Sequence, residues 1–146
     1  MHSKHLNPKA IIVSLLSLAF ASCASLENQS VIAPTIHLAG AVLTTAKSVT
    51  LGERTPMEKF TTKDVIQYFV DVTWDDVTKE AGMHRVSWNW YKETKLVSTD
   101  TKPFQMKIAP FNIWTRRAAY VLGTGKFRVD VLIDGVVTAS ANFEID

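Results

Sequence analysis

Residues 127–145 read FRVDVLIDGVVTASANFEI, and this stretch decides the fold class. Apolar and polar residues alternate on both sides of Asp134-Gly135. Such alternation is typical of a β-strand with one buried face, and Asp-Gly between two alternating runs indicates a β-hairpin. The C-terminal segment is therefore predicted to form two antiparallel strands that bury a common face.

The register of this hairpin follows from the side on which its apolar residues lie. A two-residue turn at Asp134-Gly135 would place Val131 opposite Thr138, and the polar residues of the second strand would then share the buried face. A shift of the strand register by one residue removes this conflict, because side chains alternate between the two faces with period two. We therefore predict a three-residue loop in which Gly135 is left-handed and forms a G1 bulge.

Three earlier segments show the same alternation. The first runs from Val65 to Val77, and its apolar face consists of Ile66, Tyr68, Val70, Val72 and Trp74. The second runs from His84 to Lys92, with Val86, Trp88 and Trp90 on one face. A short third strand is expected to begin at Pro103 and to end before Pro110, with Phe104, Met106 and Ile108 on one face. These segments predict further β-strands.

About seven strands without a convincing amphipathic helix predict an all-β fold, an antiparallel β-sandwich of immunoglobulin-like or fibronectin-like architecture. A transthyretin-like topology is equally open. Residues 114–145 also resemble the C-terminal end of small immunoglobulin-like domains of unknown function. The shared pattern is a Trp, then Gly-x-aromatic-Arg-Val, then Asp-Gly, then Phe-x-Ile. A single domain is expected over residues 34–146.

Residues 1–22 have the character of a signal peptide. Lys4 and Lys9 precede a largely apolar run, AIIVSLLSLAF, over residues 10–20. A membrane-spanning helix needs about 20 apolar residues, so this run suits the core of an export signal instead.

The end of this leader, Phe20-Ala21-Ser22-Cys23, resembles the lipobox of bacterial lipoproteins. In that family the leader is removed before the cysteine, which is acylated with chains such as palmitate. The resemblance implies that Cys23 carries the lipid and attaches the protein to a membrane. Ala24 stands where Asp retains lipoproteins in the inner membrane, which implies an outer-membrane lipoprotein that faces the periplasm.

A second cleavage site overlaps the first. Ala19-Phe20-Ala21 is an A-x-A sequence, and cleavage after Ala21 would release a soluble periplasmic protein. The cysteine count favours lipidation, because Cys23 is the only cysteine and an unpaired thiol is a liability in an oxidising compartment. Residues 23–33 are then expected to tether the lipid to the domain.

Composition argues against a nucleic-acid partner. Apolar residues at 47% and charged residues at 21% are ordinary for a globular protein. Two of the 16 basic residues, Lys4 and Lys9, lie in the leader, so the remaining 14 equal the 14 acidic residues. A chain without net positive charge or a basic stripe lacks the electrostatic footprint of a nucleic-acid-binding protein.

Aromatic and arginine residues are the candidates for a binding surface. Trp90, Tyr91 and Trp114 could stack on sugar rings or anchor a protein partner. Arg116 and Arg117 follow Trp114, and guanidinium groups beside aromatic rings suit carboxylate or phosphate recognition. Each residue also has a structural explanation, since tryptophans fill sandwich cores and arginines occupy solvated strand faces.

Catalytic and metal motifs are not evident in the sequence. No serine lies in a G-x-S-x-G elbow, and His37 and His84 lack the spacing of zinc ligands. Gly123 to Lys126 precedes a strand, whereas phosphate loops begin a helix. The acidic residues Asp71, Asp75, Asp76 and Glu80 are expected to be solvated rather than bound to calcium. We expect no cofactor, no metal and no enzymatic activity.

These observations predict a lipid-anchored periplasmic module that binds another envelope component, as accessory lipoproteins of envelope machines do. The partner is expected to be a protein, bound through a strand edge or the aromatic and arginine surface. One alternative is a glycan-binding module that uses Trp90, Tyr91 and Trp114. Another is an inhibitor of a lytic enzyme or protease that uses the loop from Asp75 to Gly82.

Overall fold

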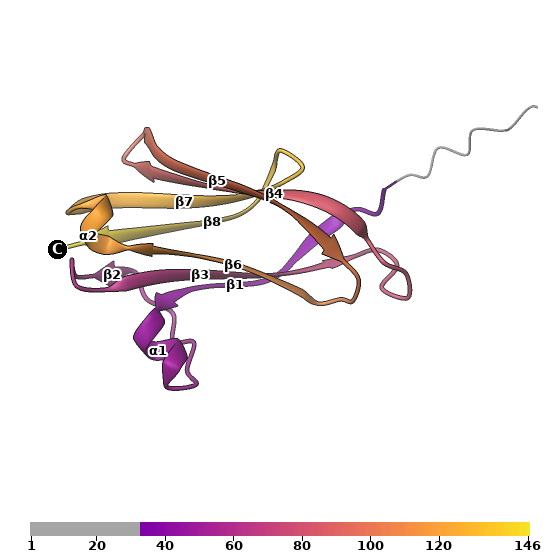
Figure 1. Ribbon diagram of the computed structural model, residues 1–146, viewed down its shortest axis with the longest axis horizontal. Coiled ribbons are helices and arrows are strands. Elements are labelled where there is room, and N and C mark those ends of the chain that lie inside the picture. The colour runs from indigo at the N-terminus through magenta and orange to yellow at the C-terminus, as the bar shows by residue number, and fades with distance from the viewer. Residues whose placement is uncertain (1–32) are drawn as a thin grey trace, which may run out of the picture. The chain divides into compact units, whose positions relative to one another are not determined.

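The computed structural model describes residues 33–146, which form two β-sheets packed face to face (Figure 1). The three-stranded sheet has the order β1 (Ile36–Thr45), β3 (Val65–Trp74) and β6 (Phe111–Ala118). The five-stranded sheet has the order β2 (Lys59–Phe60), β8 (Val136–Ile145), β7 (Gly125–Ile133), β4 (Gly82–Lys92) and β5 (Lys95–Met106). All neighbouring strands are antiparallel except β2, which runs parallel to β8. The predicted antiparallel β-sandwich is therefore confirmed.

Two short helices complete the described chain. α1 (Ala46–Thr50) lies on the side of the three-stranded sheet that faces away from the other sheet, and α2 (Ala119–Leu122) follows β6 (Figure 1). No helix within residues 33–146 is long and apolar enough to cross a membrane. The predicted signal peptide, Cys23 and all of the predicted tether except Ala33 lie outside these residues.

The apolar faces predicted for β3 and β4 form the centre of the core. All five apolar-face residues of β3 and all three of β4 are at most 2% exposed. Aromatic rings join the strands, and the Phe143 ring meets Trp90 edge-on and stacks on Phe127 at 5.4 Å. Burial of one such large side chain contributes about 1.5–3 kcal/mol. The alternation of apolar residues thus correctly identified the inner faces of these strands.

The structure contains eight strands rather than seven, and β5 is longer than predicted. It begins at Lys95, well before Pro103, and Ile108 lies beyond its end with 76% of its surface exposed. Pro103 is tolerated because β5 is an edge strand, where a missing N–H breaks no ladder bond. The first half of β5 was missed because polar residues occupy both of its faces.

The predicted three-residue loop is wrong, although the shift in register is real. Ile133 pairs with Val136 across a two-residue turn in which Asp134 and Gly135 have φ values of 50° and 85°. Positive φ at both central positions matches the right-handed twist of a hairpin. The extra residue is Thr138, which has no Cα partner in β7 because Leu132 pairs with Val137 and Val131 with Ala139. This bulge exposes Val137 (56%) but returns the later apolar residues of β8 to the core.

Asp134 holds the turn against the start of β4. Its carboxylate accepts hydrogen bonds from the Arg85 backbone N–H at 2.8 Å and from Nδ1 of the buried His84 at 2.7 Å. Partial burial raises the pKa of this carboxyl. The bonds from Arg85 and His84 and their positive charges outweigh that effect, so the pKa of Asp134 lies below its ordinary value of 3.8.

Asp134→Asn keeps a residue type that tolerates positive φ but removes the charge. Because the folded pKa is lower than the unfolded one, the charge stabilises the protein above about pH 4, and this contribution is lost as pH falls through the folded pKa. We therefore expect the free energy of unfolding of the two proteins to differ above about pH 4 and to converge as pH falls through the lowered pKa of Asp134. Urea unfolding across this range measures the difference, and a gap that does not change with pH contradicts the assignment.

Candidate binding groove

A groove of about 470 Å³ lies along one open side of the sandwich, between the edge strands β5 and β6. It arises because five strands pack on three, so the three-stranded sheet leaves the inner face of β5 incompletely covered. The residues that line it are chiefly Trp88 from β4, Asp100, Lys102 and Phe104 from β5, and Trp114 and Arg116 from β6.

Trp88 lies deepest among these residues. Its side chain is 1% exposed, and the Phe104 ring meets it edge-on at 5.9 Å. Within the described part of the chain, the Trp88 Nε1–H has no acceptor, whereas Trp74 donates its Nε1–H to the Lys79 carbonyl at 2.8 Å. A buried donor without an acceptor costs about 1–3 kcal/mol. Trp88 therefore lines the groove with an almost fully buried ring, and its Nε1–H stays out of contact with solvent.

Other buried donors near this edge are also unsatisfied by residues 33–146. They are the Trp90 Nε1–H, the Arg117 Nε–H and the hydroxyl of Tyr68, whose strand neighbour Thr115 lines the groove. Burial, with a smaller contribution from the charge of Asp130, raises the pKa of Tyr68 to about 12. The hydroxyl therefore stays protonated.

Arg117 connects the two edge strands instead of projecting into solvent. It donates to the Ser98 hydroxyl at 2.6 Å and to the Asp100 carboxylate, both on β5. Its guanidinium also lies 5.9 Å from the centre of the Trp90 ring. The prediction that Arg117 belongs to a free binding surface is therefore corrected: this side chain joins the two sheets, which fixes one end of the groove.

Trp114 and Arg116 share the outer face of the three-stranded sheet, where they lie opposite Phe69 and Gln67 of β3. The Trp114 side chain is 49% exposed, and its ring lies 6.4 Å from that of Phe69. Arg116 is exposed and makes no ion pair with any described residue. Both residues also border the groove, so these two members of the predicted surface are accessible.

The predicted aromatic platform does not exist as one surface. Trp90 is completely buried in the core. Tyr91 faces the outside of the five-stranded sheet, where the Arg128 guanidinium lies 4.5 Å from its ring centre. Successive residues of a strand point to opposite faces, so Trp90 and Tyr91 could not both join Trp114.

The four acidic residues considered for calcium bond to different partners rather than to a common site. Asp75 bonds to His37, Asp76 to Thr78 and Lys79, Asp71 to Asn112, and Glu80 to Gln105. Within residues 33–146, no group of three or more acidic, histidine or cysteine side chains is arranged to hold a metal ion.

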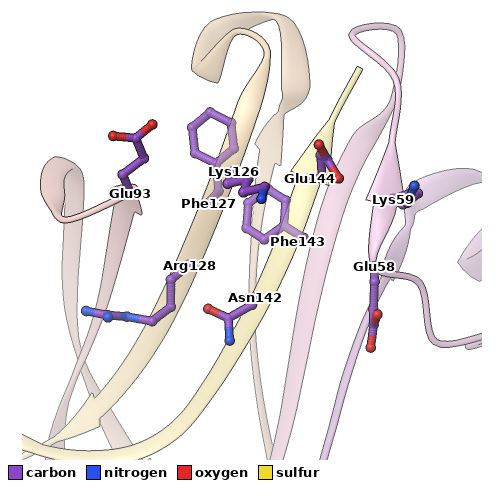
Figure 2. Close-up of a pocket in the computed structure, with 9 residues that line it drawn as sticks. All are labelled: Glu58, Lys59, Glu93, Lys126, Phe127, Arg128, Asn142, Phe143 and Glu144. Atoms are coloured by element: carbon purple, nitrogen blue, oxygen red, sulfur yellow. The ribbon is translucent and has the colours of Figure 1, made fainter.

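A second hollow, of about 380 Å³, lies at the β2, β8 and β7 end of the five-stranded sheet (Figure 2). Its charges balance, because Glu58, Glu93 and Glu144 oppose Lys59, Lys126 and Arg128. Figure 2 shows Glu93 and Glu58 on opposite sides of the hollow. The two phenylalanines that line it are at most 4% exposed. This hollow offers neither a net charge nor an accessible ring, so the β5–β6 groove is the stronger candidate.

Sequence reasoning found Trp114 and Arg116 but missed the β5 wall of the groove. A signal was present, because the inner face of β5 changes from Ser98, Asp100 and Lys102 to Phe104 and Met106. A change from polar to apolar residues on one face indicates a strand that leaves the covered part of a sheet.

Arg117→Lys should destabilise the protein, because lysine lacks the planar guanidinium that lies against the Trp90 ring while one of its nitrogens donates to both Ser98 and Asp100. Asp100 is partly exposed, so solvent screening should limit the loss to about 1 kcal/mol. The neighbouring Arg116→Lys is the matched control and should stay within about 0.5 kcal/mol of the parent. Urea unfolding measures both, and equal losses in the two variants would mean that Arg117 does not join the sheets.

No protein-family model and no curated protein matches the sequence. Among solved structures, an immunoglobulin-like protein from Pseudomonas aeruginosa is similar at 9% identity and TM-score 0.48, over 79% of this chain and 99% of that one. The CARDB domain of a Pyrococcus furiosus protein, in complex with di-metal ions, is similar at 12% identity and TM-score 0.45, over 77% and 92%.

The alkylpurine DNA glycosylase AlkC of Pseudomonas fluorescens, bound to DNA containing an abasic-site analogue, is similar at 15% identity and TM-score 0.50. The match covers 77% of this chain but 30% of the glycosylase chain. At these identities the likeness concerns the fold alone. The described domain is an antiparallel β-sandwich, as predicted.

Proposed function

We propose that this chain is an exported, non-enzymatic lipoprotein whose β-sandwich domain binds a partner protein in the bacterial cell envelope. The observation that carries the binding role is the β5–β6 groove, which combines exposed cations and a half-exposed tryptophan. Its volume of about 470 Å³ is within the range of ligand sites in proteins, about 300–1,000 Å³.

The proposed anchor is lipid on Cys23. It is supported by the leader, by the lipobox-like sequence before Cys23 and by the lack of a second cysteine in the chain. Each buried methylene of an acyl chain contributes about 0.8 kcal/mol, and two or more chains hold a protein stably. Ala24 favours the outer membrane, with the domain facing the periplasm. Cleavage after Ala21 would give a soluble periplasmic protein instead.

A protein partner is favoured over a glycan. Stacking on sugar rings needs accessible aromatic faces, and among the four tryptophans Trp74, Trp88 and Trp90 are buried while Trp114 is half exposed. The groove is instead bordered by two edge strands, each with one row of backbone groups that does not pair within its sheet. Edge strands are a common docking place for an extended polypeptide.

The anchor predicts a specific mature N-terminus. Mass spectrometry of protein extracted from membranes should find residue 23 first, with acyl chains on Cys23. Cys23→Ser should abolish lipidation, whereas Ser22→Ala keeps a small residue before the cysteine and should leave it intact. A mature wild-type protein that begins at Ser22 with a free thiol would overturn the anchor.

The class of partner needs a separate experiment. Cross-linking in intact cells, followed by capture from detergent-solubilised membranes, should yield an envelope protein that is retained by the parent chain. Sedimentation with peptidoglycan should leave the protein in the supernatant. Sedimentation with the polysaccharide and no cross-linked protein would contradict the proposed partner.

A further inference from the structure

We propose that the β5–β6 groove binds an extended acidic segment of the partner, whose carboxylates pair with Lys102 and Arg116. This inference rests on the proposed protein partner and states which chemistry of the partner the groove recognises. It follows from the charges on the groove walls and the strand edges beside it.

The charge of the groove is positive. Lys102 on β5 and Arg116 on β6 line it from opposite strands, and both side chains are exposed. Neither makes an ion pair with any residue between 33 and 146. Asp100 also lines the groove, but Arg117 already pairs with its carboxylate. Two cations from different sheets are therefore available to negative groups of a ligand.

The floor of the groove contributes little polar recognition. The Trp88 ring is 1% exposed and its Nε1 atom is out of contact with solvent, so recognition depends on the charged walls. A cationic ligand would be repelled by Lys102 and Arg116.

The groove's borders favour an extended chain. β5 and β6 end their sheets, so each has one side without a strand partner. Pro103 lacks an N–H and interrupts the donors of β5, so β6 is the edge to which we expect the segment to add as a strand. The half-exposed Trp114 ring at the β6 wall would then cover an apolar side chain between the acidic ones.

Two other surfaces carry weaker arguments. The hollow of Figure 2 has balanced charges. The opposite side of the sandwich, between β1 and β8, is already bridged by the segment before β2. There the Met57 N–H donates to the Leu43 carbonyl, and the Glu144 N–H donates to the Glu58 carbonyl, both at 2.8 Å. The β5–β6 side has no such covering segment among the described residues.

Binding can be tested with blocked nine-residue peptides added to the full chain in detergent micelles. One peptide alternates glutamate with valine, and its counterpart replaces every glutamate with glutamine. The glutamate peptide should bind at least ten times more tightly at low salt, and the difference should shrink as salt screens the charges. Equal affinity for the two peptides would overturn the proposal.

The site is located by charge-removing variants. Lys102→Gln combined with Arg116→Gln should lower the affinity for the glutamate peptide about tenfold or more. The matched control is Lys59→Gln combined with Lys126→Gln, which removes two exposed cations at the hollow of Figure 2. This control should change the affinity for the glutamate peptide less than twofold.

The outcomes separate this inference from the proposed function. If Lys102→Gln with Arg116→Gln still captures the same envelope protein in cells, the groove proposal is wrong and the partner role stands. If the parent chain captures no protein, the partner role fails as well. If an acidic oligogalacturonate binds in a way that depends on Lys102 and Arg116 while the glutamate peptide does not, the groove binds a glycan and the proposal is overturned.

Discussion

The unequal width of the two sheets is the constraint on which the rest of this structure depends. Three strands cannot cover the inner faces of five, so one edge of the larger sheet extends beyond the smaller one. Where the sheets overlap, β3, β4 and β7 form a core of aromatic and branched aliphatic side chains. Where they do not, the inner face of β5 carries Ser98, Asp100 and Lys102. Core and groove are therefore two results of the same packing mismatch.

Arg117 separates these two regions. It holds β5 to β6 through Ser98 and Asp100 and covers the edge of the Trp90 ring. In doing so it neutralises the acidic group that lines the groove and leaves the charges of Lys102 and Arg116 uncompensated within the described fold.

Alternation in the sequence was enough to predict β3, β4 and the β7–β8 hairpin, but it did not identify β1 or β6. The predicted strands bury nearly all of one face, and burial of one face is what period-two patterns report. The start of β5 has no apolar face, so it carried no such signal. The one-residue shift in the register of the hairpin was predicted correctly, but its position was not. A bulge at Thr138 and a bulge at Gly135 give the same alternation of side chains in the rest of β8.

The candidate site was only partly visible in the sequence for a related reason. Arg116 and Arg117 are adjacent, and alternation places them on opposite faces, but it does not say which face is the interior of an edge strand. The structure shows that Arg117 is the inner one and that Arg116 is exposed. Trp88, the floor of the groove, was assigned to the core, which is correct. The opening beside it depends on the strand order of both sheets, which no local pattern contains.

The central claim is that an acidic ligand occupies the β5–β6 groove, which the Trp88 side chain lines. Nuclear magnetic resonance of the indole N–H groups in ¹⁵N-labelled protein tests it directly, since Trp74, Trp88, Trp90 and Trp114 give four separate probes. On addition of the glutamate–valine peptide, the Trp88 signal should shift strongly, while that of Trp74, already bonded to Lys79, should stay in place. A Trp88 signal that does not move while the peptide binds would contradict the account.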